Sequence, residues 1–249
     1  MTPYDRRFYE RQQALSLSSA KRVIPSLVKL LTPSSVVDVG CGVATWLSVV
    51  RSCGVADVLG VDGPHVERAM LKIPVDKFAP RDLRRPLALD RRFDLAISLE
   101  VAEHLPAERA DGFVADLVAL APIVLFSAAI PHQTGVGHVN LQWPAYWVER
   151  FAKHGYRPVD LVRNAVWLDT EVAWWYAQNT LVYATAEAIA ANARLKQVAA
   201  QTDPARLARV HHGCYLDLAD KLKSAEAETR ELQRMLRRVD TVTKDDIKA

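Results

Sequence analysis

Acidic and imidazole side chains gather in two short stretches of the chain. Glu100, Glu103 and His104 lie close together, and two more histidines, His132 and His138, lie in a glycine-containing segment further along. If a helix begins at Glu100, spacings of three and four residues place the first three side chains on one face. Histidine and glutamate can accept a proton near neutral pH, and both can bind a divalent cation. The two stretches together therefore predict a general base or a metal site.

These side chains need a scaffold that brings the two stretches together. Apolar runs predict strands at 36–39, 58–62, 93–100, 123–127, 156–162 and 181–185, and helices at 20–31 and 45–51. Strands that alternate with helices are typical of a doubly wound α/β fold, in which the carboxyl ends of parallel strands meet at one edge of the sheet. Because each stretch follows a predicted strand, we expect both at that edge.

A glycine turn follows the first predicted strand. Asp38, Gly40 and Gly42 form the pattern D-x-G-x-G, and glycines allow the backbone to approach a ligand closely. The next strand ends in Asp62, where nucleotide-binding folds place an acid on a ribose hydroxyl. A dinucleotide fingerprint would need a third glycine where Thr45 stands. The pattern therefore predicts a cofactor that carries adenosine without being a dinucleotide.

The pattern Asp38-x-Gly40-x-Gly42-x-Ala44 resembles the first motif of the class I S-adenosylmethionine-dependent methyltransferases. The resemblance covers roughly residues 1–185 and implies a Rossmann-like seven-stranded sheet whose last strand runs antiparallel at the edge. It also implies that the turn packs under the methionine part of S-adenosylmethionine, that Asp38 helps to hold the amino group, and that Asp62 binds the ribose.

Three further residues take cofactor-binding roles by the same resemblance. Asp82, followed by Leu83, precedes a loop as the adenine-binding acid of the family does, and Glu100 ends the fourth strand. A solvated turn residue is the alternative interpretation of Asp82.

The segment Glu100-Val101-x-Glu103-His104 resembles O-methyltransferases of the ubiquinone-biosynthesis type and, more closely, small-RNA 3′-end 2′-O-methyltransferases. In the latter, two acids and two histidines hold a magnesium ion, which implies a metal site formed here by Glu100, Glu103, His104 and His138. Imidazole is a softer donor than Mg²⁺ prefers, so Mn²⁺ and iron stay open as alternatives. Many relatives carry this segment without a metal; Glu100, His104 and His138 would then be catalytic, with a histidine as general base.

The two resemblances imply methyl transfer to an oxygen, and we expect the acceptor to be a hydroxyl of a sugar, glycan or other small metabolite. A sugar hydroxyl is a poor nucleophile at neutral pH, so its methylation gains from a nearby base or from a cation that acidifies it. Two alternatives stay open. One is methylation of RNA 3′ ends, and the other is a non-catalytic scaffold that keeps the fold and assembles partners through its tail.

Charge and cysteine content narrow the partners and the compartment. A net charge of +3 over 249 residues and a pI of about 8.8 are mildly basic, well short of the balance typical of nucleic-acid-binding proteins. Cys41, Cys53 and Cys214 are odd in number and lack metal spacing, which favours a reducing, cytoplasmic setting. The apolar stretch 113–130 is interrupted by an aspartate and a proline, so we expect no membrane segment.

The composition changes after Thr185, where alanine and charged residues become dominant. We therefore expect a methyltransferase domain over 1–185 and a helical extension over 186–249. Within the extension, spacings of four and three alternate along a seam of Leu218, Leu222, Ala225, Thr229, Leu232, Leu236 and Val239. This heptad pattern predicts a homodimer through the C-terminal helix, and the alternative is one amphipathic helix that lies on its own domain.

Overall fold

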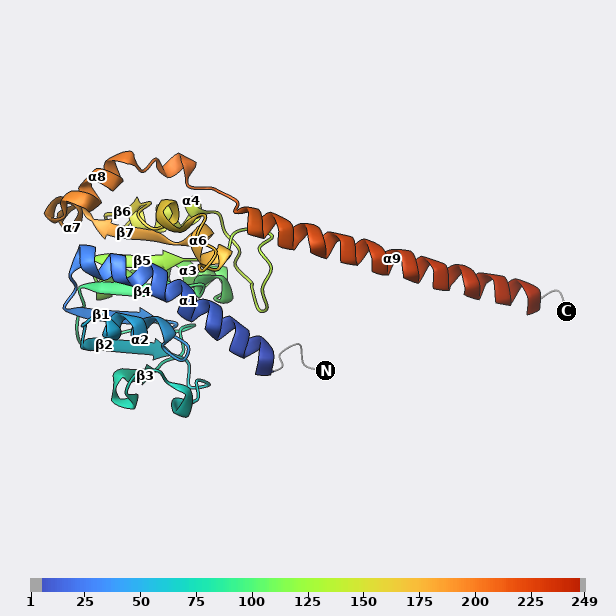
Figure 1. The fold of residues 1–249 in the computed structure, drawn as a ribbon, viewed down its shortest axis with the longest axis horizontal. Helices are drawn as coiled ribbons and strands as arrows, with labels where there is room; N and C mark the ends of the chain where they lie inside the picture. Colours follow the sequence, from blue (N-terminus) through green and yellow to red (C-terminus); the bar gives the residue numbers. More distant parts are fainter. Residues whose placement is uncertain (1–5, 247–249) are drawn as a thin grey trace. The chain divides into compact units, whose positions relative to one another are not determined.

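The protein was analysed as a computed structural model, which describes residues 6–246 and the side chains of 13–236 (Figure 1). The chain divides into two compact units, of which the first ends at His211 and the second begins at His212. We call them the sheet unit and the α9 unit. The boundary predicted at residue 185 falls at the end of the last strand, whereas the sheet unit includes the next 26 residues to His211.

Seven strands form one mixed sheet, as predicted. They are β1 (Ser35–Val39), β2 (Asp57–Asp62), β3 (Phe78–Pro80), β4 (Leu95–Leu99), β5 (Ile123–Ser127), β6 (Tyr156–Val159) and β7 (Leu181–Thr185). Their order is β3-β2-β1-β4-β5-β7-β6, and β7 alone runs antiparallel to its neighbours. The carboxyl ends of β1, β2, β4 and β5 therefore meet at one edge, which is the edge where both candidate stretches were expected.

The position of β7 differs from the prediction. The strand is antiparallel, but it lies between β5 and β6, so the edge strand is β6. The reason is visible in the two sequences. Four consecutive residues of β7, Leu181 to Ala184, are buried, as in an interior strand. Pro158 in β6 has no N–H to donate to a further strand and therefore suits an edge.

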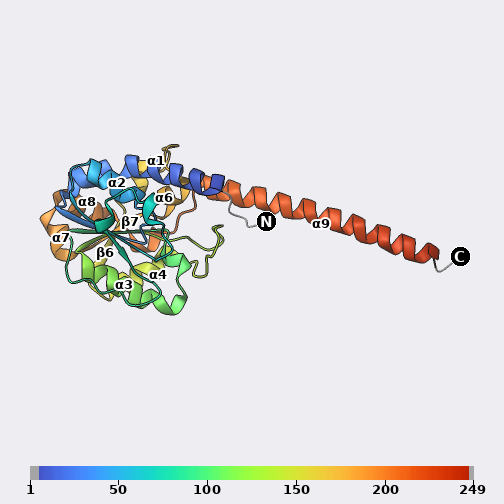
Figure 2. The same cartoon turned by 90° about the horizontal axis from the view of Figure 1, so that it is seen from below.

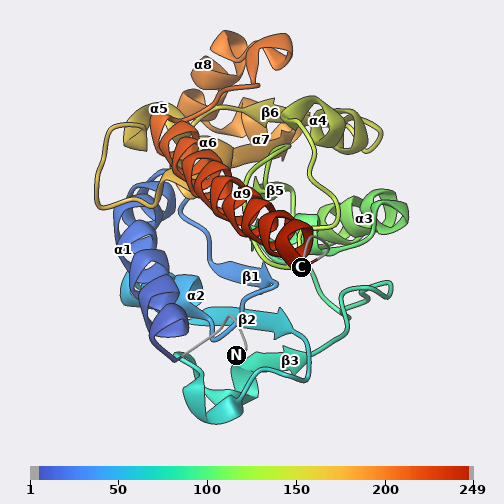
Figure 3. The same cartoon turned by 90° about the vertical axis from the view of Figure 1, so that its right-hand side faces the viewer.

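Helices cover both faces of the sheet. They are α1 (Arg6–Leu31), α2 (Thr45–Ser52), α3 (Ala110–Leu120), α4 (Pro144–Ala152), α5 (Arg163–Val166), α6 (Trp174–Asn179), α7 (Ala186–Ala191) and α8 (Ala193–Gln201). Figures 2 and 3 show α1 and α2 on one face and α3 and α4 on the other. Val36 of β1 packs with the first pair, whereas Val37 and Val39 pack with the second. A strand buried on both faces in this way requires the continuous apolar run seen in the sequence.

Three expected elements differ clearly from their predicted bounds. The helix predicted at 20–31 begins earlier, at Arg6, the strand predicted at 93–100 spans only Leu95–Leu99, and the strand predicted at 156–162 ends at Val159. The C-terminal helix α9 (His212–Asp246) forms the second unit by itself. Among the described residues, no helix is both long and apolar enough to cross a membrane.

Candidate active site

The glycine turn after β1 has a backbone that only small residues tolerate. Gly40 has φ +87°, and a Cβ there would lie 2.3 Å from a methyl carbon of Val101. Gly42 has φ +53°, and Ala44, the residue before α2, also lies in the left-handed region. Positive φ values and this close approach explain why the turn requires glycines.

Asp62 fastens this turn to the end of β2. Its carboxylate accepts hydrogen bonds from the backbone N–H groups of Gly42 and Gly63, both at 2.6 Å. His65 lies nearby, with its Nε2 3.8 Å from an oxygen of Asp62. His65 belongs to no sequence motif. Asp62 thus lies against Gly42 of the turn, and its binding of a ribose stays a prediction.

Asp38, also assigned to the cofactor, is a buried carboxyl with a perturbed pKa. Burial raises the pKa of Asp38 well above its usual range, and the negative charge of Asp62 raises it further. A cation placed against Asp38 would offset both effects. The environment of Asp38 therefore suits the ammonium group that the family resemblance assigns to it.

Asp82 and Leu83 follow the carboxyl end of β3, at the same edge of the sheet as the glycine turn. Both carboxylate oxygens of Asp82 accept hydrogen bonds from the Arg84 guanidinium at 2.9 Å, and these bonds lower the Asp82 pKa. Leu83 is 8% exposed and belongs to the apolar core with α3 and α4. An adenine contact by Asp82 would therefore have to share the carboxylate with Arg84.

The helix expected to start at Glu100 does not form, which corrects the predicted arrangement. Glu100 has φ +55°, and a short 3₁₀ turn over Ala102–His104 follows it. The backbone N–H of Glu100 donates to the Ser127 hydroxyl at 3.0 Å, which anchors this residue to the end of β5. Left-handed residues interrupt a right-handed helix, so Glu100 and Glu103 do not share a helical face.

Buried amides hold the carboxylate of Glu100. Asn179 donates to one oxygen at 3.0 Å, and Gln133 donates to the other at 2.9 Å. Gln178 in turn donates to Gln133 at 3.1 Å and accepts the backbone N–H of His211 at 2.8 Å. Sequence reasoning missed these amides, because nothing in their local sequence connects them to Glu100.

The backbone carbonyl of Glu103 holds the loop that follows β5. It accepts the N–H groups of Val139 and Asn140 at 2.8 and 3.0 Å. The Nδ1 atom of His104 lies 3.2 Å from the carbonyl oxygen of Gly137. These three contacts bring His138 against the 3₁₀ turn, as expected for two stretches at one edge of the sheet.

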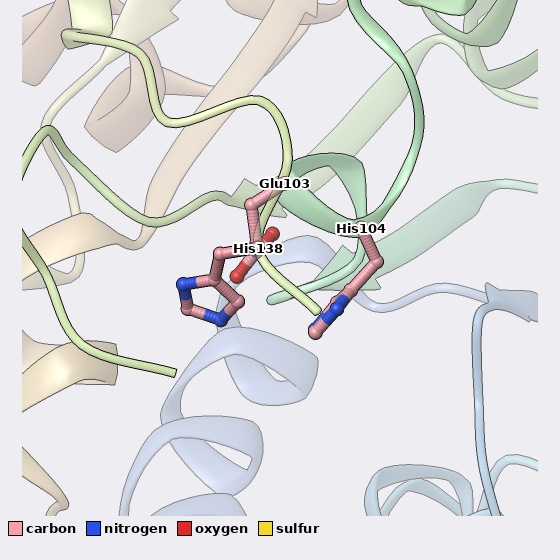
Figure 4. A group of neighbouring side chains, drawn as sticks. All are labelled: Glu103, His104 and His138. Atoms are coloured by element: carbon pink, nitrogen blue, oxygen red, sulfur yellow. The ribbon is translucent and has the colours of Figure 1, made fainter. Parts of the chain in front are cut away.

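Glu103, His104 and His138 form a cluster of possible metal ligands (Figure 4). One carboxylate oxygen and one nitrogen of each ring lie within 4.8 Å of one another. Glu103 is 0% exposed, and among the described residues neither of its carboxylate oxygens has a hydrogen-bond partner. Glu100, the fourth residue of the predicted metal site, is not part of this group; its oxygens are occupied by amides.

The pKa values in the cluster move in opposite directions for acid and base. Burial raises the pKa of Glu103 well above its usual range, and the nearby charge of Glu100 adds to the effect; burial also raises the pKa of Glu100. Burial lowers the pKa of His104 and of His138, and for His138 the charge of His104 lowers it further. Both rings therefore lose their proton at a lower pH than the ordinary histidine value of about 6.5.

Other candidate side chains lie outside the cluster. His132 is exposed, with φ +67°, and is absent from the cluster. Residues 167–179 include three tryptophans and Tyr176. Tyr176 packs edge to face on Trp46, with 5.0 Å between the ring centroids, and belongs to the core. Trp143 is 42% exposed and precedes α4, beside the loop that carries His138.

Comparisons with known proteins agree with this architecture. A family model described as a methyltransferase domain matches residues 9–157. No curated protein sequence matches the chain. Among solved structures, the sugar N-methyltransferase KedS8 from a Streptoalloteichus species is similar, with a TM-score of 0.57 and 14% identity over 73% of this chain and 93% of that chain.

Two structures with bound cofactor or product are also similar. Magnesium protoporphyrin IX methyltransferase from Synechocystis, with bound S-adenosylhomocysteine, has a TM-score of 0.53 and 15% identity over 72% of this chain and 88% of that chain. Human N-acetylserotonin methyltransferase, in complex with S-adenosylmethionine, has a TM-score of 0.50 and 13% identity over 72% of this chain and 55% of that chain. At such identities the shared feature is the fold. Because the methyltransferase domain model spans more than half of the chain, the protein belongs to the class I S-adenosylmethionine-dependent methyltransferases.

Proposed function

We propose that this protein transfers the methyl group of S-adenosylmethionine to a hydroxyl oxygen of a sugar, a glycan or another small metabolite. The observation that carries the proposal is the convergence of Glu103, His104 and His138 at the sheet edge where the glycine turn lies. An amine acceptor needs no strong base once it is neutral, whereas a hydroxyl does. A buried carboxylate beside two neutral imidazoles can supply the base that a hydroxyl acceptor needs.

The cofactor side of the proposal rests on residues at the ends of β1 and β2. Asp62, held by the N–H groups of Gly42 and Gly63, would accept hydrogen bonds from the ribose hydroxyls. Asp38, whose carboxyl is buried near Asp62, would pair with the ammonium group. S-Adenosylmethionine supplies an electrophilic methyl group on a sulfonium. The role of the chain is to hold that methyl in line with the acceptor oxygen.

His138 is the proposed general base, with His104 as its neighbour. The acceptor hydroxyl would lose its proton to an imidazole nitrogen as the new C–O bond forms and the S–CH₃ bond breaks. The His138 ring also has a hydrogen bond with the backbone of Gln133, whose effect on the pKa is smaller than that of burial. The lowered pKa favours the unprotonated form of the ring at neutral pH.

The cluster also fits a divalent cation. The test of fit is the orphaned carboxylate of Glu103, because a buried charge without a partner is costly and a cation would remove that cost. Glu103, His104 and His138 would hold the ion, either Mg²⁺ or Mn²⁺, and the two imidazoles favour Mn²⁺. In that case His138 would be a ligand of the cation instead of the general base. A bound cation would lower the pKa of an acceptor hydroxyl that approaches it.

Two observations support the acceptor class. The structural neighbour KedS8 is a sugar N-methyltransferase, and the exposed Trp143, five residues after His138, offers an aromatic face of the kind that sugar rings pack on. We extend the proposal to a reducing, cytoplasmic setting, because Cys41, Cys53 and Cys214 are all free thiols in the structure.

Calorimetry with S-adenosylmethionine and S-adenosylhomocysteine, with and without Mg²⁺ or Mn²⁺, tests the first half of the proposal. Wild type should bind both compounds, and Asp62→Ala should lose most of the affinity. Asp57→Asn, at the opposite end of the same strand, is the matched control and should bind like wild type. Absence of binding to wild type under every condition would contradict the proposal and favour a scaffold.

Transfer of a labelled methyl group to a panel of hydroxyl and amine acceptors tests the second half. Nuclear magnetic resonance of the product identifies the methylated atom. We expect an O-methyl product; an N-methyl product from wild type would overturn the choice of acceptor atom while leaving the cofactor assignment intact. If chelation abolishes transfer and Mn²⁺ restores it, the cation belongs to the mechanism; unchanged transfer under chelation assigns the chemistry to the histidines alone.

A further inference from the structure

The α9 unit carries an apolar seam with a strict heptad spacing. The seam residues Leu218, Ala225 and Leu232 take position d of the heptad, and Leu222, Thr229 and Leu236 take position a; the predicted Val239 lies beyond the described side chains. All of them lie on one helix, which runs without interruption from His212 to Asp246 over 35 residues. A spacing of 3.5 residues stays on one line only when two helices wrap around each other with a left-handed twist.

The leucines of this seam are exposed. Leu222 is 61% exposed, Leu232 54% and Leu236 64%. Tyr215, seven residues before Leu222, takes the preceding position a of the heptad and is 66% exposed. Soluble proteins leave single apolar residues exposed, but a regular line of large ones marks a surface that another helix covers. The remaining positions carry mostly charged or small residues, as expected on the outside of a two-helix pair.

Charges beside the seam indicate which partner fits. With Leu222 at position a, Lys221 takes position g and Glu226 takes position e. In a parallel, in-register pair, a residue at g meets the residue at e five positions later on the other helix. A second copy of this helix would therefore place its Glu226 against Lys221, and the reverse contact would form by symmetry. The same rule pairs Glu228 with Gln233, which is compatible without repulsion.

The one polar residue in the described seam does not oppose pairing. The hydroxyl of Thr229 donates to the backbone carbonyl of Ala225 at 2.8 Å, so its hydrogen is already used within the helix. A polar residue at a single position a penalises shifted registers, in which it would face leucine. Thr229 therefore favours the register in which it faces its own copy.

We propose that α9 forms a parallel, two-stranded coiled coil with a second copy of this chain. The pair would bury the seam of Leu218, Leu222, Leu232 and Leu236 and would form two symmetric contacts between Lys221 and Glu226. The proposal does not depend on the methyltransferase chemistry, because every residue that carries it lies in the α9 unit.

Multi-angle light scattering on the full-length protein, over a range of concentrations, measures the oligomeric state. We expect a mass of twice the 27.7 kDa chain that falls toward one chain on dilution. The variant Leu222→Glu should give the mass of one chain at all concentrations. Leu216→Glu is the matched control, since Leu216 is 55% exposed on the same helix but lies off the seam, and it should remain dimeric. Thermal unfolding of the sheet unit checks that both variants are folded.

A charge swap tests the direction of the two helices. Lys221→Glu should weaken the dimer at least tenfold at low salt, and the double change of Lys221→Glu with Glu226→Lys should restore it, because the parallel contact reforms with reversed signs. A wild-type mass of one chain at every concentration would overturn the proposal, as would equal disruption by Leu216→Glu and Leu222→Glu. A double change that leaves the dimer as weak as Lys221→Glu alone would overturn the parallel arrangement.

Discussion

The imidazole rings of His104 and His138 lie edge to face, with 4.9 Å between their centroids. The first ring belongs to the turn after β4 and the second to the loop after β5, and the carbonyl of Glu103 joins the two segments. Because the charge of His104 lowers the pKa of His138, a proton on one ring disfavours a proton on the other. The pair is therefore suited to holding a single proton.

Replacement of His138 by alanine should slow methyl transfer by about 10²- to 10⁴-fold, the usual contribution of a general base, and leave S-adenosylmethionine binding unchanged. The acid limb of kcat/KM for wild type should lie below about pH 6.5, the ordinary value for histidine, because burial and His104 lower the His138 pKa. Steady-state kinetics across pH measure both. His132→Asn, in the same loop, keeps a residue that tolerates positive φ and should behave like wild type; unchanged turnover of His138→Ala would remove His138 from the mechanism.

The substitution Glu103→Gln should raise the melting temperature of the metal-free protein at neutral pH. Burial raises the pKa of Glu103 in the folded state. The protonated carboxyl therefore contributes its full stability only below about pH 4.3, the ordinary value for glutamate. This contribution is lost as the pH rises through the pKa of the folded state. The stabilisation should therefore shrink toward acidic pH. Scanning calorimetry at several pH values measures it, and a variant less stable than wild type at neutral pH would show that the carboxylate has a partner. Added Mn²⁺ should stabilise wild type more than the variant.

Alanine at Gly135 should displace His138. A Cβ at this position would lie 2.1 Å from two ring atoms of His138, so the ring has to move. A displacement of about 1 Å of a catalytic group costs about 10²-fold in rate, while the cofactor half stays intact. Val136→Ala, the next residue and 59% exposed, is the control. Full activity of Gly135→Ala would mean that the ring position observed here is not the one that transfers the proton.

The substitution Asn179→Asp should destabilise the protein at neutral pH, and it should destabilise the protein less at acidic pH. The change removes the N–H donor to Glu100 and adds a second buried carboxyl, a loss of about 1–3 kcal/mol. When the new carboxyl is protonated, it can donate a hydrogen bond to Glu100 again. The loss of unfolding free energy should therefore become smaller as the pH is lowered. Urea unfolding at both pH values measures the difference, and a penalty independent of pH would show that Asn179 acts only by packing.

The sequence predicted the parts of the fold that rest on uninterrupted local patterns. The strands over Ile123–Ser127 and Leu181–Thr185 have the predicted bounds because apolar runs with clear ends form them. The strand β3 was missed, since three residues give too short a pattern. The glycine turn followed from the residues themselves, whereas the seven-stranded sheet followed from resemblance to a family, and the structure confirms the sheet.

The site was predictable in position and less so in geometry. Parallel strands bring Glu103, His104 and His138 to one edge whatever the details of their loops. The orientation of Glu100 depends on Gln133 and Asn179, which are 33 and 79 residues away along the chain, and no local pattern reports such contacts. Its left-handed backbone likewise follows from the tertiary setting, since nothing in the neighbouring sequence requires it.

The end of the sheet unit limits where the chain can be shortened. The guanidinium of Arg163, 0% exposed, donates to the carbonyl of Leu207, and the backbone N–H of His211 donates to Gln178 within the amide series that reaches Glu100. A truncation after Thr185 would leave a buried arginine and a buried glutamine short of partners, and the loss would reach the site through Gln133. A truncation after His211 keeps these contacts, so a minimal enzyme ends there.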